Sequence, residues 1–117
     1  MVALMANQAF AEVTYSSTTV TPASPHVGQS YTATGNCSWT EGSNPVPTQA
    51  KVELLDANGK VLKNITSSYY YDAVNRKLSV IGASTAPAAG SYSVKITYLK
   101  SDGTFYGSSA RDMTVVP

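Results

Sequence analysis

The feature that most constrains this chain is the alternation of apolar and polar residues, with a period of two, in two separate segments. In Gly90–Lys100 the alternating apolar residues are Tyr92, Val94, Ile96 and Tyr98. In Gln29–Trp39 the residues on the corresponding face are Tyr31, Ala33, Gly35, Cys37 and Trp39. Successive side chains of a strand point to opposite faces, so each segment predicts a strand with one buried face. Helical spacing is absent downstream of Ala11, and the fold class is therefore predicted as all-β.

Turn-forming residues divide the rest of the chain into further short strands. We predict strands within residues 12–21, 29–39, 49–56, 60–66, 67–72, 77–82, 90–100 and 104–116. The Asn58-Gly59 pair suits a hairpin turn that requires positive φ, and Gly107 to Ser109 predicts a bulge in the last strand. The expected architecture is a single domain over residues 12–117, an antiparallel sandwich of seven to eight strands.

Composition and charge exclude several partners. Charged residues make up only 13% of the 117 residues, about half the usual share for soluble proteins. The net charge is +1, and no basic run exists that would release counterions from nucleic acid, so nucleic-acid binding is not expected. No segment approaches the roughly 20 apolar residues of a transmembrane helix, so no membrane span is expected.

The first eleven residues differ from the rest. Residues 9–11 read Ala-Phe-Ala, the small-x-small pattern after which signal peptidase cleaves, and residues 2–6 are apolar. This pattern is typical of the end of a signal peptide, and the alternative is an ordinary N-terminal tail. The first interpretation predicts a secreted, periplasmic or cell-surface protein whose mature chain begins near Glu12.

Three segments resemble immunoglobulin-like domains. Residues 88–94 (AAGSYSV) resemble the corner between strands E and F, where a tyrosine, here Tyr92, bonds back to the upstream backbone. Residues 21–29 and 52–61 resemble the A–B start and the C–C′ hairpin of bacterial immunoglobulin-like and fibronectin type III-like repeats. The resemblance implies a Greek-key β-sandwich used for adhesion, spacing or recognition. Val94 stands where antibody domains place their second cysteine, so Cys37 has no partner and is expected to be buried.

Residues for catalysis or metal binding are scarce. His26 is the only histidine and Cys37 the only cysteine, which excludes a His-pair metal site. No Gly-x-Ser-x-Gly elbow accompanies the histidine, and no basic cluster adjoins the cysteine to activate its thiol. We expect no enzymatic activity, no metal and no cofactor.

Aromatic residues and loops supply the candidate binding residues. Tyr69, Tyr70 and Tyr71 are consecutive, so alternation places Tyr70 on the face opposite the other two. Exposed tyrosines offer large contact area at low entropic cost, whereas buried ones would serve packing at a sheet edge. Trp39 presents the same choice between core and contact surface. The immunoglobulin-like topology would gather three loops at one end: Thr40–Thr48 with Asn44, Asp72–Arg76, and Ser101–Gly103 with Asp102.

Three functions remain open at this point. The first is a binding or adhesion module that contacts a protein or a second copy of itself through these loops and tyrosines, or through strand addition at a sheet edge. The second is a carbohydrate-binding module with Trp39 and the tyrosines as an aromatic platform. The third is a structural spacer or assembly subunit.

Overall fold

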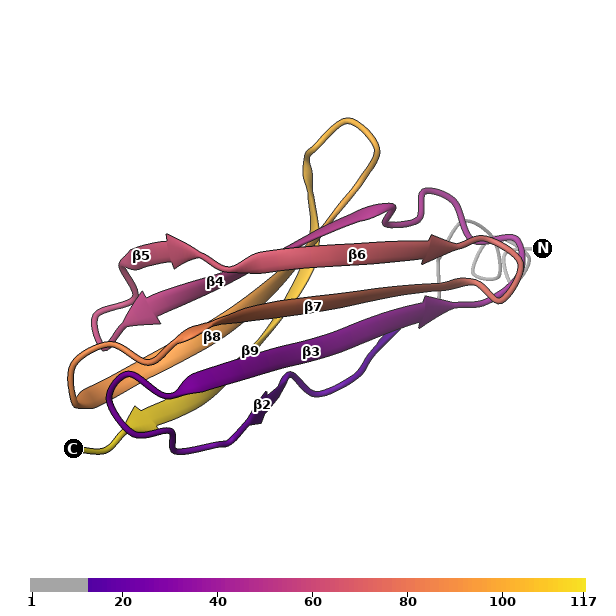
Figure 1. Cartoon of the computed structure of the whole chain (residues 1–117). Coiled ribbons are helices and arrows are strands. Elements are labelled where there is room, and N and C mark those ends of the chain that lie inside the picture. The colour runs from indigo at the N-terminus through magenta and orange to yellow at the C-terminus, as the bar shows by residue number, and fades with distance from the viewer. Residues whose placement is uncertain (1–12) are drawn as a thin grey trace.

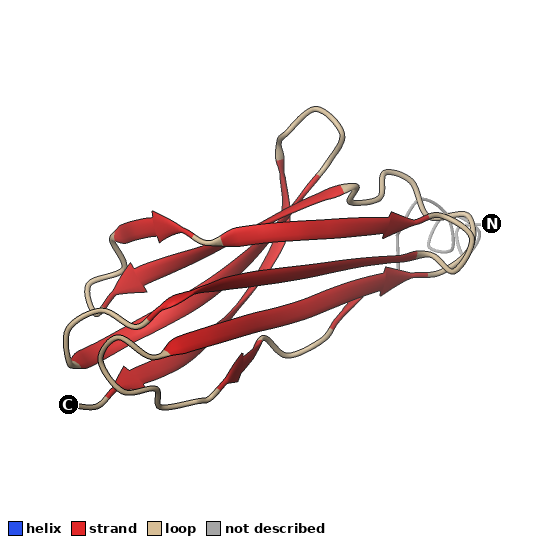
Figure 2. Ribbon diagram, viewed as in Figure 1, coloured by secondary structure: helices blue, strands red, loops and turns tan. Residues whose placement is uncertain are grey.

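Two antiparallel sheets packed face to face form the molecule (Figure 1). The structure is a computed structural model that describes residues 13–117, so the predicted signal-peptide remnant at residues 1–11 lies outside the described residues. Over residues 13–117 the chain forms nine strands joined by loops (Figure 2). No helix in that range has the length and apolar character to cross a membrane.

The strand order is that of an immunoglobulin-like sandwich. The first sheet contains β1 (Val13–Tyr15), β2 (Thr19–Thr21), β3 (Ser30–Trp39), β7 (Lys77–Thr85) and β6 (Thr66–Asp72). The second contains β5 (Val61–Asn64), β4 (Gln49–Asp56), β8 (Gly90–Leu99) and β9 (Phe105–Val115). These sheets correspond to the ABED and C′CFG sheets of such domains, and the chain passes between them after β3, β5 and β7. The predicted fold is confirmed, with nine strands rather than seven or eight.

The predicted first strand is divided in two. β1 pairs with the end of β3 and β2 with its middle, and residues 16–18 separate them. At the break, the Ser16 hydroxyl accepts a hydrogen bond of 2.8 Å from the Asn36 N–H. The side chain takes the place of a backbone carbonyl, and the regular ladder is interrupted there.

The core follows the predicted inner faces. Tyr31, Ala33, Cys37 and Trp39 of β3 are buried, as are the inward residues of β4 and β8. Among residues 61, 62 and 65, the predicted alternatives for the next strand, only Ile65 is buried. Val61 and Leu62 are about half exposed because β5 is a short edge strand that pairs with only a few residues of β4.

Two predicted turn details need correction. In the β4–β5 hairpin only Gly59 has positive φ (84°), and the Asp56 carboxylate accepts hydrogen bonds from the N–H groups of Asn58 and Lys60. In the last hairpin Tyr98 pairs with Gly107 and Leu99 with Phe105, so Tyr106 is the extra residue of the bulge. The bulge thus lies one residue before the predicted segment.

The predicted tyrosine corner is present. The Tyr92 hydroxyl donates a hydrogen bond of 2.7 Å to the carbonyl of Ala88 and ties the β7–β8 connection to β8. We expect Tyr92→Phe to lower the free energy of unfolding by about 1 kcal/mol, since a net hydrogen bond is worth about that much. Urea denaturation measures the effect. Tyr69→Phe is the matched control, because the Tyr69 hydroxyl forms no hydrogen bond within residues 13–117, and an equal loss in both variants would contradict this role for Tyr92.

Burial makes Cys37 a source of alkaline instability. Its thiol is fully buried, and desolvation raises its pKa from 9.0 to about 12. In the unfolded chain the thiol ionises above pH 9, while the folded chain keeps its proton, so stability falls as pH rises from about 9 toward 12. Between pH 9 and 10 we expect the decline to be steeper in the parent than in Cys37→Ala by about 1 kcal/mol per pH unit, since tyrosine ionisation affects both proteins equally. Parallel declines in the two proteins would disprove this assignment.

Candidate functional site

Three loops meet at one end of the sandwich. The Trp39 N–H donates to the carbonyl of Arg76 at 3.1 Å, which joins the end of β3 to the β6–β7 turn. The Thr48 N–H donates to the Leu99 carbonyl at 2.9 Å. The Gln49 amide reaches the Ser101 carbonyl at 3.0 Å. The last two bonds attach the β3–β4 loop to the β8–β9 hairpin, which projects from the sandwich in Figure 1. We call this end the loop pole.

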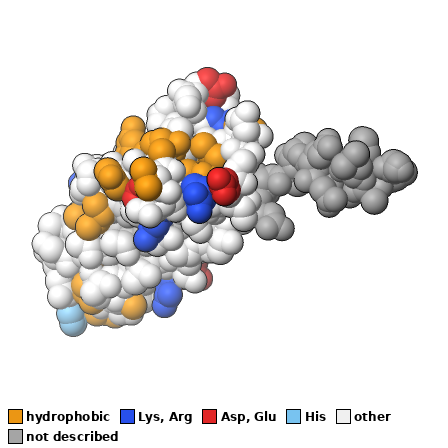
Figure 3. Space-filling view, turned by 90° about the vertical axis from the view of Figure 1, so that its right-hand side faces the viewer, with side chains coloured by type: hydrophobic (Ala, Val, Ile, Leu, Met, Phe, Trp, Pro, Cys, Tyr) orange, Lys and Arg blue, Asp and Glu red, His pale blue; other side chains and the backbone are white. Residues whose placement is uncertain are grey.

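A cleft of about 410 Å³ opens at the loop pole between the β3–β4 loop and the β8–β9 hairpin. It is lined by Asn44, Pro45, Val46, Thr48, Tyr71, Lys100, Ser101 and Asp102. Three of the six predicted binding residues, Asn44, Tyr71 and Asp102, therefore surround one cleft. Figure 3 views this end and shows hydrophobic side chains gathered on part of the surface, among a few charged ones.

Trp39 supports the cleft from behind rather than lining it. Its side chain is only 8% exposed, and its ring stacks on that of Tyr71 with centroids 5.9 Å apart and planes at 14°. The prediction of Trp39 as a contact residue is corrected on this point. The last residue of β3 still points inward, because its alternation continues to the end of the strand.

All three tyrosines lie on the edge strand β6, and their side chains point to both faces of the first sheet. β6 is the last strand of the first sheet, and Tyr69 and Tyr71 pair with the buried Val80 and Leu78 of β7. They point inward but remain 46% and 39% exposed, because no strand covers that edge of the first sheet within residues 13–117. Tyr70 points to the outer face and is 67% exposed. A single aromatic platform of Trp39 and all three tyrosines, the predicted glycan surface, is therefore not formed.

The acidic side chains of the loop pole hold its turns. Asp102 accepts hydrogen bonds from the N–H and the hydroxyl of Thr104, at 2.9 and 2.6 Å, and these bonds lower the pKa of its carboxyl group. Asp72 likewise accepts hydrogen bonds from the N–H and the side-chain amide of Asn75, and these bonds lower the pKa of its carboxyl group. Both carboxylates are ionised at neutral pH. Within the described residues no three His, Cys, Asp or Glu side chains are grouped to hold a metal ion.

Lys100 was not predicted at this site, and Pro45 and Val46 were predicted only as part of the loop Thr40–Thr48. Lys100 lines the cleft and its positive charge helps to lower the pKa of Asp102, while Pro45 and Val46 form an apolar part of the wall. The Tyr106 hydroxyl donates to the Pro45 carbonyl at 3.2 Å and fixes the loop over the second sheet. The Pro-Val-Pro run of residues 45–47 was the available signal, since prolines give a loop a fixed course.

Comparison with known proteins shows the fold and no closer relationship. No family model and no curated protein sequence matches the chain. Among solved structures, it is similar to the CARDB domain of a Pyrococcus furiosus protein, solved in complex with di-metal ions, with 18% identity over 92% of this chain and 90% of that one and a TM-score of 0.56. CopC from Methylosinus trichosporium OB3b matches with 26% identity over 92% of this chain and 95% of that one, at a TM-score of 0.42. The chain is an immunoglobulin-like β-sandwich domain.

Proposed function

We propose that this chain is a non-enzymatic binding module that contacts a protein partner, or a second copy of itself, through the cleft at the loop pole. The observation that carries the proposal is the convergence of Asn44, Tyr71 and Asp102 on that cleft. A tyrosine ring beside asparagine and serine side chains is a combination found in recognition loops, and charged groups such as those of Lys100 and Asp102 suit the rim of an interface. Hydrogen bonds hold the two loops in place, which reduces the entropy that binding would cost.

The placement of the reactive side chains favours binding over catalysis. His26 lies on the β2–β3 connection, where it pairs with Val116 near the C-terminus, at the end of the sandwich opposite the loop pole (Figure 1). Its Nδ1 atom is 3.1 Å from the carbonyl of Pro117. The Cys37 thiol is buried in the core. Neither group is among the described residues that line the cleft, and the Asp102 carboxylate there accepts hydrogen bonds from Thr104.

The outer edge of β6, which pairs with no strand of residues 13–117, offers a second mode of contact. Residues 67–72 lie on the last strand of the first sheet and contain no lysine and no proline, two residues that commonly protect such edges. An extended segment of a partner, or β6 of a second copy, would extend the sheet through backbone hydrogen bonds.

The proposed setting of the module is the cell exterior or the periplasm. Its support is the sequence pattern of residues 1–11 and a surface in which hydroxyl groups outnumber charges. Detection of the chain in the secreted or surface fraction of the cells that produce it would test this setting.

Site-specific photocrosslinking in those cells tests the contact surface. p-Benzoylphenylalanine is placed at Asn44 in the cleft, at Ser67 on the β6 edge, or at Asn58 in the β4–β5 turn, all of which are exposed. Asn58 is the control, since its turn lies at the other end of the sandwich (Figure 1). We expect adducts from Asn44, with mass spectrometry separating a partner from a second copy. Adducts from Ser67 but not from Asn44 would show that the contact is strand addition at β6. If neither position gave adducts, the function as a structural spacer would be favoured.

A further inference from the structure

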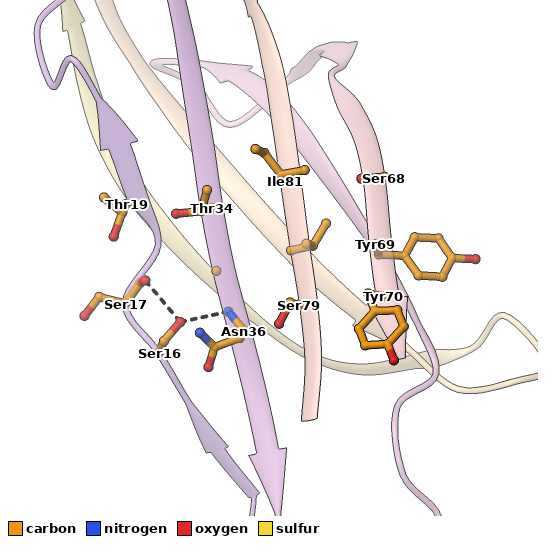
Figure 4. Close-up of a pocket in the computed structure, with 12 residues that line it drawn as sticks. Ser16, Ser17, Thr19, Thr34, Asn36, Ser68, Tyr69, Tyr70, Ser79 and Ile81 are labelled. Atoms are coloured by element: carbon orange, nitrogen blue, oxygen red, sulfur yellow. Dashed lines mark hydrogen bonds between the residues drawn. The ribbon is translucent and has the colours of Figure 1, made fainter. Parts of the chain in front are cut away.

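A second groove crosses the outer face of the first sheet, away from the loop pole. Its volume is about 430 Å³, and it runs over β2, β3, β7 and β6. The break between β1 and β2 at Ser16 and Ser17 forms one wall, and Tyr70 stands at the other (Figure 4). The ring of Tyr69 points away from β7 in this view.

Strand register arranges the floor of the groove in transverse rows. Asn36, Ser79 and Tyr70 are cross-strand partners in one row on β3, β7 and β6. Thr34, Ile81 and Ser68 form the next row on the same strands, and β2 extends it by one strand. Neighbouring strands lie about 4.8 Å apart, so the floor from β2 to β6 spans about 14 Å. This length suits an extended chain lying across the strands rather than a compact small molecule.

The groove is uncharged over the described part of the chain, because no Asp, Glu, Lys, Arg or His among residues 13–117 lines it. Most lining side chains carry a hydroxyl or an amide, and among the residues drawn in Figure 4 hydrogen bonds are marked only at Ser16. Within residues 13–117 the other side-chain hydroxyl and amide groups of the lining have no hydrogen-bond partner, so they can bond to a ligand or to water. Two larger apolar surfaces lie among them: the Tyr70 ring, 67% exposed, and the Ile81 side chain, 39% exposed.

We infer that this groove binds an uncharged glycan chain. A sugar ring presents hydroxyl groups at its rim and C–H groups on its faces. The rim matches the hydroxyl and amide rows, while the C–H face packs against an aromatic ring, whose π-face is electron-rich. An uncharged lining provides no counter-charge for an anionic ligand, which would lose its hydration without compensation. The site is separate from the loop pole and does not depend on the function proposed for it.

Affinity electrophoresis in native gels tests the inference. The full chain is run in gels containing a neutral polysaccharide (barley β-glucan, konjac glucomannan or dextran) or an anionic one (alginate or polygalacturonate). We expect at least one neutral polysaccharide to retard the protein. Binding measured in parallel by calorimetry should change little in 1 M NaCl, because no ion pair contributes to it. Retardation by the anionic polysaccharides alone, or by none of the five, would overturn the inference.

Three variants locate the site. Tyr70→Ala should weaken binding by about tenfold or more, the loss expected for one aromatic contact of about 1.4 kcal/mol. Ser79→Lys, which places a long charged side chain on the groove floor, should abolish retardation. Phe105→Ala is the matched control: this aromatic residue is 60% exposed on β9 of the second sheet and does not line the groove, so the variant should bind as the parent does. Since residues 70 and 105 are both exposed, thermal melts should show that these two variants remain folded, and equal binding by Tyr70→Ala and the parent would refute the assignment.

Discussion

Gly82→Ala is expected to lower the free energy of unfolding by about 3 kcal/mol, at the upper end of the range for overpacked cores. A Cβ atom at residue 82 would lie 2.8 Å from the Ile65 carbonyl oxygen and 3.0 Å from the Cβ of Val52. The nearest of these atoms, the carbonyl oxygen, belongs to the backbone and cannot move aside as the tip of a flexible side chain could. At this point the chain crosses from the second sheet to the first: the Ile65 N–H donates to the Val52 carbonyl, and the Ile65 carbonyl accepts from the Ala83 N–H. Any shift that relieves the clash would strain these bonds.

Gly35→Ala is the matched comparison for Gly82→Ala. Gly35 is also buried within a long strand, but there the nearest atom to a new Cβ would be the Cδ1 of Ile96, the tip of a flexible side chain. Chemical denaturation of both variants should show a clearly smaller loss for Gly35→Ala. Equal losses would mean that crowding in the core, and not the crossing at Ile65, sets the requirement for glycine.

Trp39→Ala is expected to cost about 3–5 kcal/mol of stability, the usual range for truncating a buried tryptophan. The indole is almost fully buried and packs against the core on one side and the Tyr71 ring on the other. Its removal leaves a cavity beneath Tyr71, which is then free to leave the cleft wall. Denaturant titration measures the loss of stability, and the Asn44 photocrosslink measures the loss of contact.

Tyr71→Ala separates the effect on stability from the effect on contact at the cleft. The Tyr71 ring is 39% exposed, so its removal should cost less stability than that of Trp39 while reducing the Asn44 adducts to a similar extent. Trp39→Phe should retain most of both properties, since a smaller ring still stacks. If Trp39→Ala remained as stable as the parent, the buried position assigned to the indole would be wrong.

The sequence predicted β3, β4 and β8 with nearly correct bounds, because each has one buried face and ends at a turn residue. The alternation within 49–56 gave β4 without error. Prediction was poorer where an element has no buried face of its own. The break at Ser16 depends on a hydroxyl that replaces a carbonyl of the ladder, and only the position of β3 decides that.

The candidate site was predicted in part. The turns around Asn44 and Asp102 were visible as loops rich in Asn, Pro, Ser and Gly, and the resemblance to immunoglobulin-like domains placed them at one end. Their meeting with Tyr71 depends on the partner strand of β6, and the groove beside Tyr70 depends on the register of three other strands. Long-range pairing of this kind leaves no local signal in the chain.

By itself, the alternation in Gln29–Trp39 and Gly90–Lys100 predicted an all-β protein and showed which side chains of these two strands face the core. That follows because the period of two fixes the face of every residue in a strand. Only the tertiary structure decided that Trp39 is buried beneath Tyr71, and that the tyrosines on both faces of β6 remain exposed. The physical reason is that β6 is an edge strand, which leaves both of its faces partly open to solvent.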